Sequence, residues 1–279
     1  GSELHALFAR LVRTLRDEGR APDRARDLMM LHEWADERLR DLREEVPPPS
    51  EEVFERERKG VLDDLRAFLD AECEGLHGNR PVGIEVSFGL PVDGDEPEAL
   101  SSPAPVPIAL DAHPPVMLRG RIDRINVIAP GEIEVIDYKT GGYWDAGWQG
   151  RFAGGTRLQH ALYGLAAEEL FRRRGETVSV VQGRYLFPAV RGRRRQKVIA
   201  APGRETLGRV LGSLVRVLAG GSFIVSPATD GCRYCQFAAA CHAVGPGADD
   251  RSEETRAARK VEHAANTMLA AFRELRSHE

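Results

Sequence analysis

Residues 119–141, which read RGRIDRINVIAPGEIEVIDYKTG, limit most narrowly what this chain can fold into. Two runs of alternating apolar residues flank a Pro-Gly pair, which is typical of a β-hairpin. With the turn at that pair, Asp123 faces Asp137, and Lys139 shares their face while Tyr138 points away. The same face carries four apolar side chains, Ile125, Val127, Ile133 and Val135. The hairpin therefore ends in two opposed carboxylates with an ammonium one step further on.

This pair of carboxylates favours a cation site. Directly opposed like charges are destabilising, so such a pair persists where a cation neutralises it or where it shares a proton. A hard divalent cation with oxygen ligands suits it best. The ammonium of Lys139 can orient a water and stabilise charge on a phosphate, which favours phosphodiester hydrolysis. Ordinary surface ion pairs on an edge hairpin are the alternative, since Asp…Asp-x-Lys is a common pattern.

The remaining sequence predicts a mixed α/β fold. Apolar spacing and helix-start signals predict helices over residues 3–18, 22–45, 50–76, 157–173, 204–218 and 252–276. Alternating runs predict strands over residues 82–90, 106–110, 178–188 and 196–201, besides the hairpin. A long Pro- and Ser-rich excursion fills residues 91–115. This order predicts a central mixed sheet with helical cover.

Composition limits the possible partners. The chain has 279 residues, 42% hydrophobic and 29% charged, which is enough for a sizeable core. The net charge of −4 gives no global basic field, although RRRGE and VRGRRRQK are local basic runs. Such a run can hold a phosphate backbone or form a solvated face. No run approaches the roughly 20 apolar residues of a membrane span and no signal peptide is visible, so we expect a cytoplasmic protein with no membrane partner.

The motifs GRIDRI, VIDYKTG and LQHALYG together resemble the PD-(D/E)XK nuclease superfamily, specifically its RecB-like branch. The resemblance implies a restriction-endonuclease-like mixed sheet flanked by helices. It also implies that Asp123 and Asp137 bind Mg²⁺ or Mn²⁺, with the backbone carbonyl of Tyr138 as a further ligand. Lys139 takes the place of the catalytic lysine of that branch.

A helix after the hairpin carries Gln159 and Tyr163, which match the family's Q-x-x-x-Y motif. The resemblance implies that both support the site and contact DNA. One helical turn separates them, so they lie on one face of the helix. The alternative is a polar pair that ends a helix face.

Two further residues match the family near the start of the chain. GSELHALF implies that His5 is a metal ligand; the alternative is an exposed histidine near a terminus. Glu85, in GIEVSFG, matches a recurrent acidic position on the family's first strand. It could equally pair with Arg119 or Arg121.

The cysteines predict a second metal site. Cys232, Cys235 and Cys241 form C-x₂-C-x₅-C, and three thiolates suit zinc or an iron–sulfur cluster better than disulfides in a cytoplasmic chain. Resemblance to AddB-type and CRISPR-associated adaptation nucleases implies a [4Fe–4S] cluster whose fourth cysteine precedes the metal-binding histidine. Only four residues precede His5. Either Cys73 is the fourth ligand, or trimming removed that ligand and Cys73 is merely packed; a [3Fe–4S] cluster, zinc or an empty site would then follow.

The resemblance predicts a metal-dependent deoxyribonuclease, expected to be an exonuclease on single-stranded DNA in end processing and recombinational repair. We divide it into a helical part with the histidine (1–80), a nuclease core (81–225) and a cysteine-bearing segment with the last helix (226–279), integrated as one domain. No G-x₄-G-K-[ST] occurs, so a helicase would lie on a removed segment or a partner chain. The alternatives are a degenerate nuclease fold that only binds DNA or a partner, and a structural zinc or iron–sulfur module. Three aromatic residues of the loop after the hairpin either stack on bases or pack onto the domain: Tyr143, Trp144 and Trp148.

Overall fold

The computed structural model describes residues 2–75, 80–91, 97–110, 113–219, 236 and 267–278. Two compact units divide the chain: residues 1–151 with 157–203, and residues 152–156 with 204–279. The three-part division expected from the sequence stays a prediction. Among the helices in the described ranges, none combines the length and the apolar character needed to cross a membrane.

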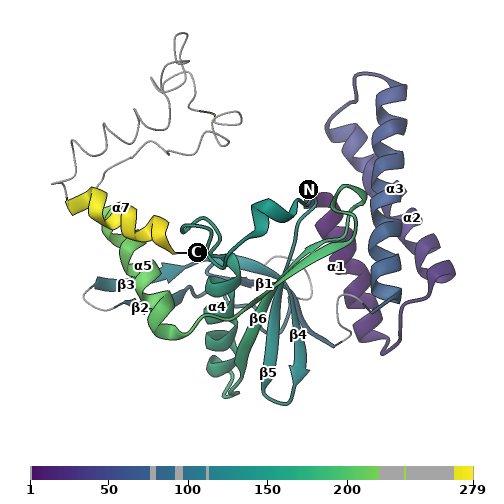
Figure 1. The fold of residues 1–279 in the computed structure, drawn as a ribbon. Coiled ribbons are helices and arrows are strands. Elements are labelled where there is room, and N and C mark those ends of the chain that lie inside the picture. The colour runs from purple at the N-terminus through teal and green to yellow at the C-terminus, as the bar shows by residue number, and fades with distance from the viewer. Residues whose placement is uncertain are drawn as a thin grey trace, which may run out of the picture. The chain divides into compact units, whose positions relative to one another are not determined.

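The first unit holds the sheet and most of the helices (Figure 1). Its helices are α1 (Ser2–Asp17), α2 (Arg24–Glu45), α3 (Glu51–Cys73) and α4 (Gln159–Arg173), with the short 3₁₀ helices η1 (Asp145–Trp148) and η2 (Val190–Gly192). Its strands are β1 (Pro81–Phe88), β2 (Val106–Leu110), β3 (His113–Leu118), β4 (Gly120–Ala129), β5 (Glu132–Tyr138), β6 (Ser179–Phe187) and β7 (Arg195–Ala200). The second unit contains α5 (Arg204–Ala219) and α7 (Thr267–Ser277).

The expected helix starts have a local cause. The side chain of Asp23 accepts hydrogen bonds from the first backbone N–H groups of α2, and Ser50 accepts one from Val53 in α3. Such caps satisfy N–H groups that have no partner within the helix. β3 was not expected, because the Pro-rich sequence around it lacks clear alternation. Of the helix predicted over 252–276, residues 252–266 lie outside the described part of the chain.

The main sheet has the strand order β1-β4-β5-β6-β7, while β2 and β3 form a separate two-stranded sheet. β5 and β6 are parallel, and every other neighbouring pair is antiparallel. The mixed α/β fold predicted from the sequence is therefore confirmed. The β4–β5 register is also the expected one, since Ile125 pairs with Val135 and Val127 with Ile133. Extended by one more pair of positions, this register sets Asp123 opposite Asp137.

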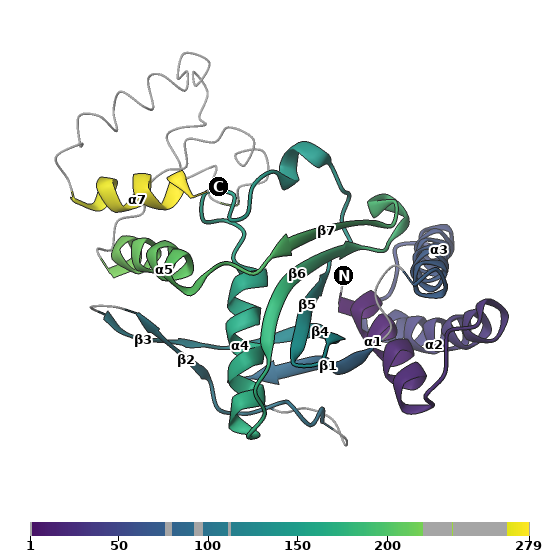
Figure 2. The same cartoon turned by 60° about the horizontal axis from the view of Figure 1, so that its bottom comes forward.

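Helices cover both faces of the sheet (Figure 2). On one face, α1, α2 and α3 pack against the sheet through Ile84, Ile136 and Tyr138. On the other, α4 packs against the sheet through side chains that include Ile125 and Val135. Tyr138 thus points to the face opposite the apolar side of the hairpin, as its place in the alternation predicts.

In β1, the alternation of side chains between the two faces of the sheet breaks at Glu85. Glu85 has φ +53, in the left-handed region that a non-glycine residue rarely adopts. As a result Ile84 and Val86 pack on opposite faces of the sheet although they are two positions apart. A backbone outlier of this kind costs about 1–3 kcal/mol and is concentrated at functional sites. The outlier therefore makes Glu85 a candidate for a functional role.

In the second unit, α5 and α7 pack against each other. Arg216 of α5 pairs with Glu274 of α7. The short segment 152–156 joins them through Gly154, whose N–H donates a hydrogen bond to the carbonyl oxygen of His278 over 2.7 Å. Cys232, Cys235 and Cys241 lie outside the described residues.

Candidate active site

Asp123 and Asp137 lie at the end of the β4–β5 hairpin, where the sheet is still covered on both faces. Their side chains are only 12% and 10% exposed. The backbone N–H of Tyr138 donates a hydrogen bond to Oδ2 of Asp123 over 2.7 Å, so this carboxylate reaches across to β5. The strand pairing and this bond bring both acids to the same end of the hairpin.

His5 and Glu85 join Asp123 from neighbouring elements. One ligand atom from each of the three side chains lies within 4.8 Å of the other two. Nδ1 of His5, on α1, is 3.6 Å from Oδ2 of Asp123. Glu85 is close to Arg121 as well, at 3.7 Å, so the arginine pairing considered from the sequence coexists with its place beside Asp123.

Asp137 begins a chain of polar contacts that leads to α4. Oδ2 of Asp137 is 2.6 Å from Nζ of Lys139, and Lys139 donates a hydrogen bond to Oε1 of Gln159 over 2.7 Å. Gln159 in turn donates to the hydroxyl of Tyr163 at 3.4 Å. The first helical turn of α4 therefore holds the Lys139 ammonium beside Asp137.

Burial raises the pKa of all three carboxyl groups. The pKa of Asp123 rises to about 6, chiefly by desolvation and against the hydrogen bond from Tyr138. Asp137 also reaches a pKa of about 6, through desolvation and repulsion by Asp123. The pKa of Glu85 rises to about 7 for the same two reasons. Burial lowers the pKa of His5, so its imidazole is neutral at pH 7 and able to act as a ligand.

These groups fit a hard divalent cation. The donor set is three carboxylates and one imidazole, of the types that bind Mg²⁺ and Mn²⁺. Oε1 of Glu85 is buried, and no described residue donates a hydrogen bond to it. Oδ2 of Asp137 is buried as well, and the ammonium of Lys139 lies 2.6 Å from it. Buried anionic oxygens are costly unless a cation compensates them.

Comparison with known proteins assigns the chain to a family. The sequence pattern of the PD-(D/E)XK nuclease superfamily matches residues 1–242. The chain belongs to this superfamily. Over 111 residues it is also 39% identical to one subunit of the ATP-dependent helicase/deoxyribonuclease of Symbiobacterium thermophilum, a match that covers 38% of this chain and 9% of that relative. The chain thus spans a small part of that relative's length.

This PD-(D/E)XK nuclease has a buried polar network behind the site that sequence reasoning missed. Arg124, directly after Asp123, is 1% exposed and donates hydrogen bonds to Glu72 of α3 at 2.8 Å and to the Tyr138 hydroxyl at 3.4 Å. Arg124 also donates to Asn126 at 2.8 Å. The network fixes both Tyr138 and the residue beside Asp123. A charged residue, Arg124, within a strand pattern of alternating apolar residues was the sequence signal for this network. Only the fold reveals its partner on the distant helix α3.

The structure brings together seven of the residues predicted for the nuclease site: His5, Glu85, Asp123, Asp137, Lys139, Gln159 and Tyr163. Their chemical roles, and that of the Tyr138 carbonyl, stay predictions. Cys73 is half-buried at the end of α3 and packs against the core formed with α1 and α2, and burial raises the pKa of its thiol. That position agrees with a packing role, and its role as a cluster ligand stays a prediction.

Proposed function

We propose that this chain is a Mg²⁺- or Mn²⁺-dependent deoxyribonuclease. The observation that carries the proposal is the convergence of His5, Asp123 and Glu85 within 4.8 Å of one another, with the Asp137–Lys139 pair at the same hairpin end. Membership of the PD-(D/E)XK superfamily supports a nuclease role for such a site. A fold that only binds DNA would have no need for buried carboxylates whose charge opposes phosphate.

Four groups would hold the cation: His5, Asp123, Asp137 and the backbone carbonyl of Tyr138. Glu85 faces the same position and would either bind the ion directly or accept from its water. When bound, the cation would polarise the scissile phosphate and lower the pKa of a water. The raised pKa values of the acids support this assignment, because a cation would convert an unfavourable cluster into a neutralised one.

Lys139 would act on the phosphate and the attacking water. Its ammonium is 2.6 Å from Asp137 and bonded to Gln159, so it is held at the edge of the acid cluster. In the hydrolysis, the water oxygen bonds to phosphorus and gives up a proton to solvent, one phosphorus–sugar oxygen bond breaks, and the departing oxygen takes up a proton from solvent. Lys139 would hold the water and offset charge on the phosphate, while Gln159 and Tyr163 would fix the direction of the ammonium.

Single-stranded DNA delivered by a helicase is the proposed substrate, with exonucleolytic end processing in recombinational repair as its setting. The name of the Symbiobacterium thermophilum relative joins a helicase with a deoxyribonuclease, which favours such a partner. Cys232, Cys235 and Cys241 would hold a [4Fe–4S] cluster with a fourth ligand, as the resemblance to AddB-type nucleases implies. We place the protein in the cytoplasm, where unpaired thiols stay reduced.

Cleavage of end-labelled DNA tests the proposal. Single- and double-stranded oligonucleotides are incubated with anaerobically purified protein in Mg²⁺, in Mn²⁺ and in EDTA. We expect metal-dependent cleavage that Asp123→Asn abolishes, and label at either end reveals the polarity. Binding of DNA without cleavage in any metal would instead support the degenerate, binding-only alternative. Calorimetry with Mn²⁺ separates the two, since a degenerate site binds no metal.

A further inference from the structure

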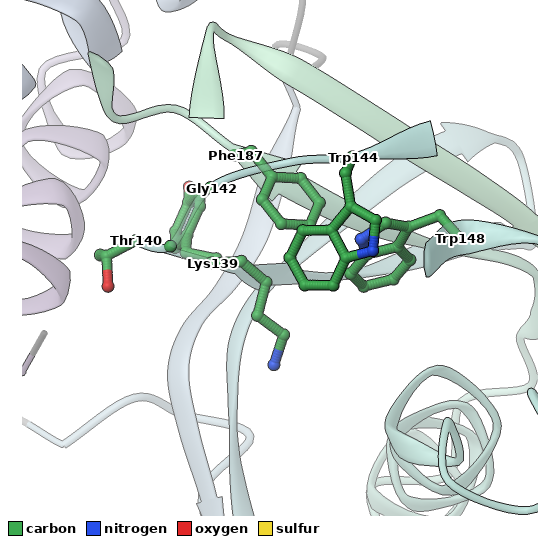
Figure 3. A pocket seen from close by; sticks show the side chains of 8 residues that line it. Lys139, Thr140, Gly142, Trp144, Trp148 and Phe187 are labelled. Atoms are coloured by element: carbon green, nitrogen blue, oxygen red, sulfur yellow. The ribbon is translucent and has the colours of Figure 1, made fainter. Parts of the chain in front are cut away.

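A pocket opens directly beside Lys139, on the side of the loop that follows β5. It has a volume of about 350 Å³, toward the lower end of sites that hold small organic molecules. The chain from Tyr138 to Gly142 forms one part of the lining, and the rings of Trp144, Trp148 and Phe187 form the rest. Figure 3 shows these three rings gathered on one side of Lys139. The pocket is therefore aromatic where the site next to it is charged.

Trp148 is held in place by protein contacts and forms a fixed part of the pocket lining. Its ring lies 4.8 Å from that of Tyr185 and 5.0 Å from that of Phe187, measured between centroids. The guanidinium of Arg157 covers it at 4.4 Å and donates hydrogen bonds to the carbonyl oxygens of Gly147 and Gly150. These contacts hold the loop and fix Trp148 as a wall of the pocket.

Trp144 is different, because most of its ring is left uncovered by the described part of the chain. It is 63% exposed, an unusual state for so large an apolar side chain. Its indole nevertheless packs closely against Gly147: a Cβ atom added to that glycine would lie 2.0 Å from Nε1 of Trp144. Any side chain at position 147 would displace the ring. The loop sequence thus places a large flat surface at the rim of the pocket and leaves it open to solvent.

A turn that approaches the pocket is rich in basic residues. The turn between β6 and β7 carries exposed arginines, and its Arg191 carbonyl oxygen approaches Gly142 of the pocket wall. Arg193 and Arg194 both have positive φ values, 53° and 54°, in a turn that glycine or asparagine would form with less strain. Arg194 pairs with Glu74, while neither Arg191 nor Arg193 pairs with a carboxylate of the described residues. Positive charge beside open aromatic rings is the combination that binds single-stranded nucleic acid.

We propose that this pocket receives one unstacked nucleobase of a single-stranded DNA substrate, stacked on Trp144, with the adjoining phosphate directed to Lys139. The inference rests on the proposed function for its substrate, but it assigns a separate binding site. A base fits because every base offers a flat π-face, whereas an apolar peptide side chain would make no use of the flanking arginines. Bases paired in a duplex are already stacked and cannot enter, so the pocket gives a physical reason for preference for single strands.

The test compares two single-stranded 12-mers of equal charge, one of thymidines and one wholly abasic, by fluorescence anisotropy without cleavage in EDTA. Wild-type protein should bind the thymidine strand about 10-fold more tightly, the value of one stacked base. In Trp144→Ala this ratio should fall to about 1, because phosphate contacts are common to both strands. Trp144→Phe should retain most of the ratio, and Gly147→Ala should lower it by displacing the indole.

Met29→Ala is the matched control, since Met29 is a similarly exposed apolar residue (65%) on α2 that does not line the pocket. It should leave the ratio at the wild-type value. A wild-type ratio near 1, or the same ratio in wild type and Trp144→Ala, overturns the base pocket. The nuclease proposal fails by a different result. If the protein cleaves no DNA with any metal, but its preference for the thymidine strand still depends on Trp144, then the base site stands and the catalytic role is rejected.

Discussion

The backbone N–H of Tyr138 donates a 2.7 Å hydrogen bond to Oδ2 of Asp123, while the ring of the same tyrosine is buried on the face of the sheet that α1, α2 and α3 cover. Tyr138 thereby ties the acid of β4 to the core under α1 and α3. Its phenol also accepts a hydrogen bond from Arg124. The position of Asp123 is therefore set from both strands of the hairpin, which prepares the site before any ligand arrives.

Lys139→Ala should remove DNA cleavage while leaving the fold intact. We expect the rate to fall by about 100-fold or more, as on loss of a charge that stabilises a transition state. Lys139 is 32% exposed and lies just after β5, so little packing is lost. The measurement is metal-dependent cleavage of labelled single strands, with circular dichroism to verify folding. Lys59→Ala, an exposed lysine on α3, is the control. Undiminished cleavage by Lys139→Ala would reject the assignment.

Asp123→Asn should stabilise the metal-free protein at neutral pH. The folded-state pKa of Asp123 is about 6, above the usual 3.8, so the folded protein binds the proton more tightly than the unfolded chain. The free energy of unfolding of the wild type therefore falls as pH rises from about 4 to about 6 and stays low above it. The asparagine avoids that loss, which amounts to at most about 3 kcal/mol, and can still accept from Tyr138.

Thermal unfolding between pH 4 and pH 8 in EDTA measures this effect. The gain in Tm of the variant should grow with pH and level off near pH 7. Mn²⁺ should raise the Tm of the wild type at pH 7 but not that of Asp123→Asn, because a ligand stabilises only the state that binds it. A Tm difference that is constant with pH would contradict the raised pKa.

Glu72→Ala should destabilise the protein strongly. Oε1 of Glu72 is 2.8 Å from Nη1 of Arg124, and the two side chains are 6% and 2% exposed. Loss of one partner leaves a buried charge with less compensation, which costs about 3–5 kcal/mol. Urea unfolding gives the free energy, and Glu72→Gln should lose less. Glu37→Ala, from the exposed Arg10–Glu37 pair, should change it by less than about 1 kcal/mol. Equal effects of the two alanine variants would refute the role of the network.

The cysteine triplet should bind iron and sulfide. Protein purified without oxygen is expected to be brown, with absorbance at about 400 nm. Cys235→Ser should remove this absorbance, because a missing thiolate opens the cluster. Cys73→Ser separates the two candidates for the fourth ligand: loss of colour would assign Cys73 as that ligand, and retained colour would leave it as a packed side chain. Colourless protein that contains zinc by metal analysis would replace the cluster with a zinc site.

Local pattern was sufficient for the hairpin and its register. The alternation of residues 119–141 and the Pro-Gly turn set Asp123 opposite Asp137, because a shift by one residue would turn every apolar side chain to the wrong face. Cap residues such as Ser50 likewise fixed helix starts, since capping acts within one turn of the chain. β3 escaped detection because its proline-rich sequence has no alternation to recognise.

Tertiary structure alone decided how distant residues meet. No spacing in the sequence indicates that Glu72 neutralises Arg124, that Lys139 is held by Gln159, or that Trp144 is seated on Gly147. The left-handed backbone of Glu85 was also invisible, because a glutamate in a strand pattern predicts ordinary alternation. Sequence patterns were sufficient to predict the family, the mixed fold and the kinds of group at the site. Their distances, burial and raised pKa values came from the packing of helices onto both faces of one sheet, because desolvation depends on everything that surrounds a charge.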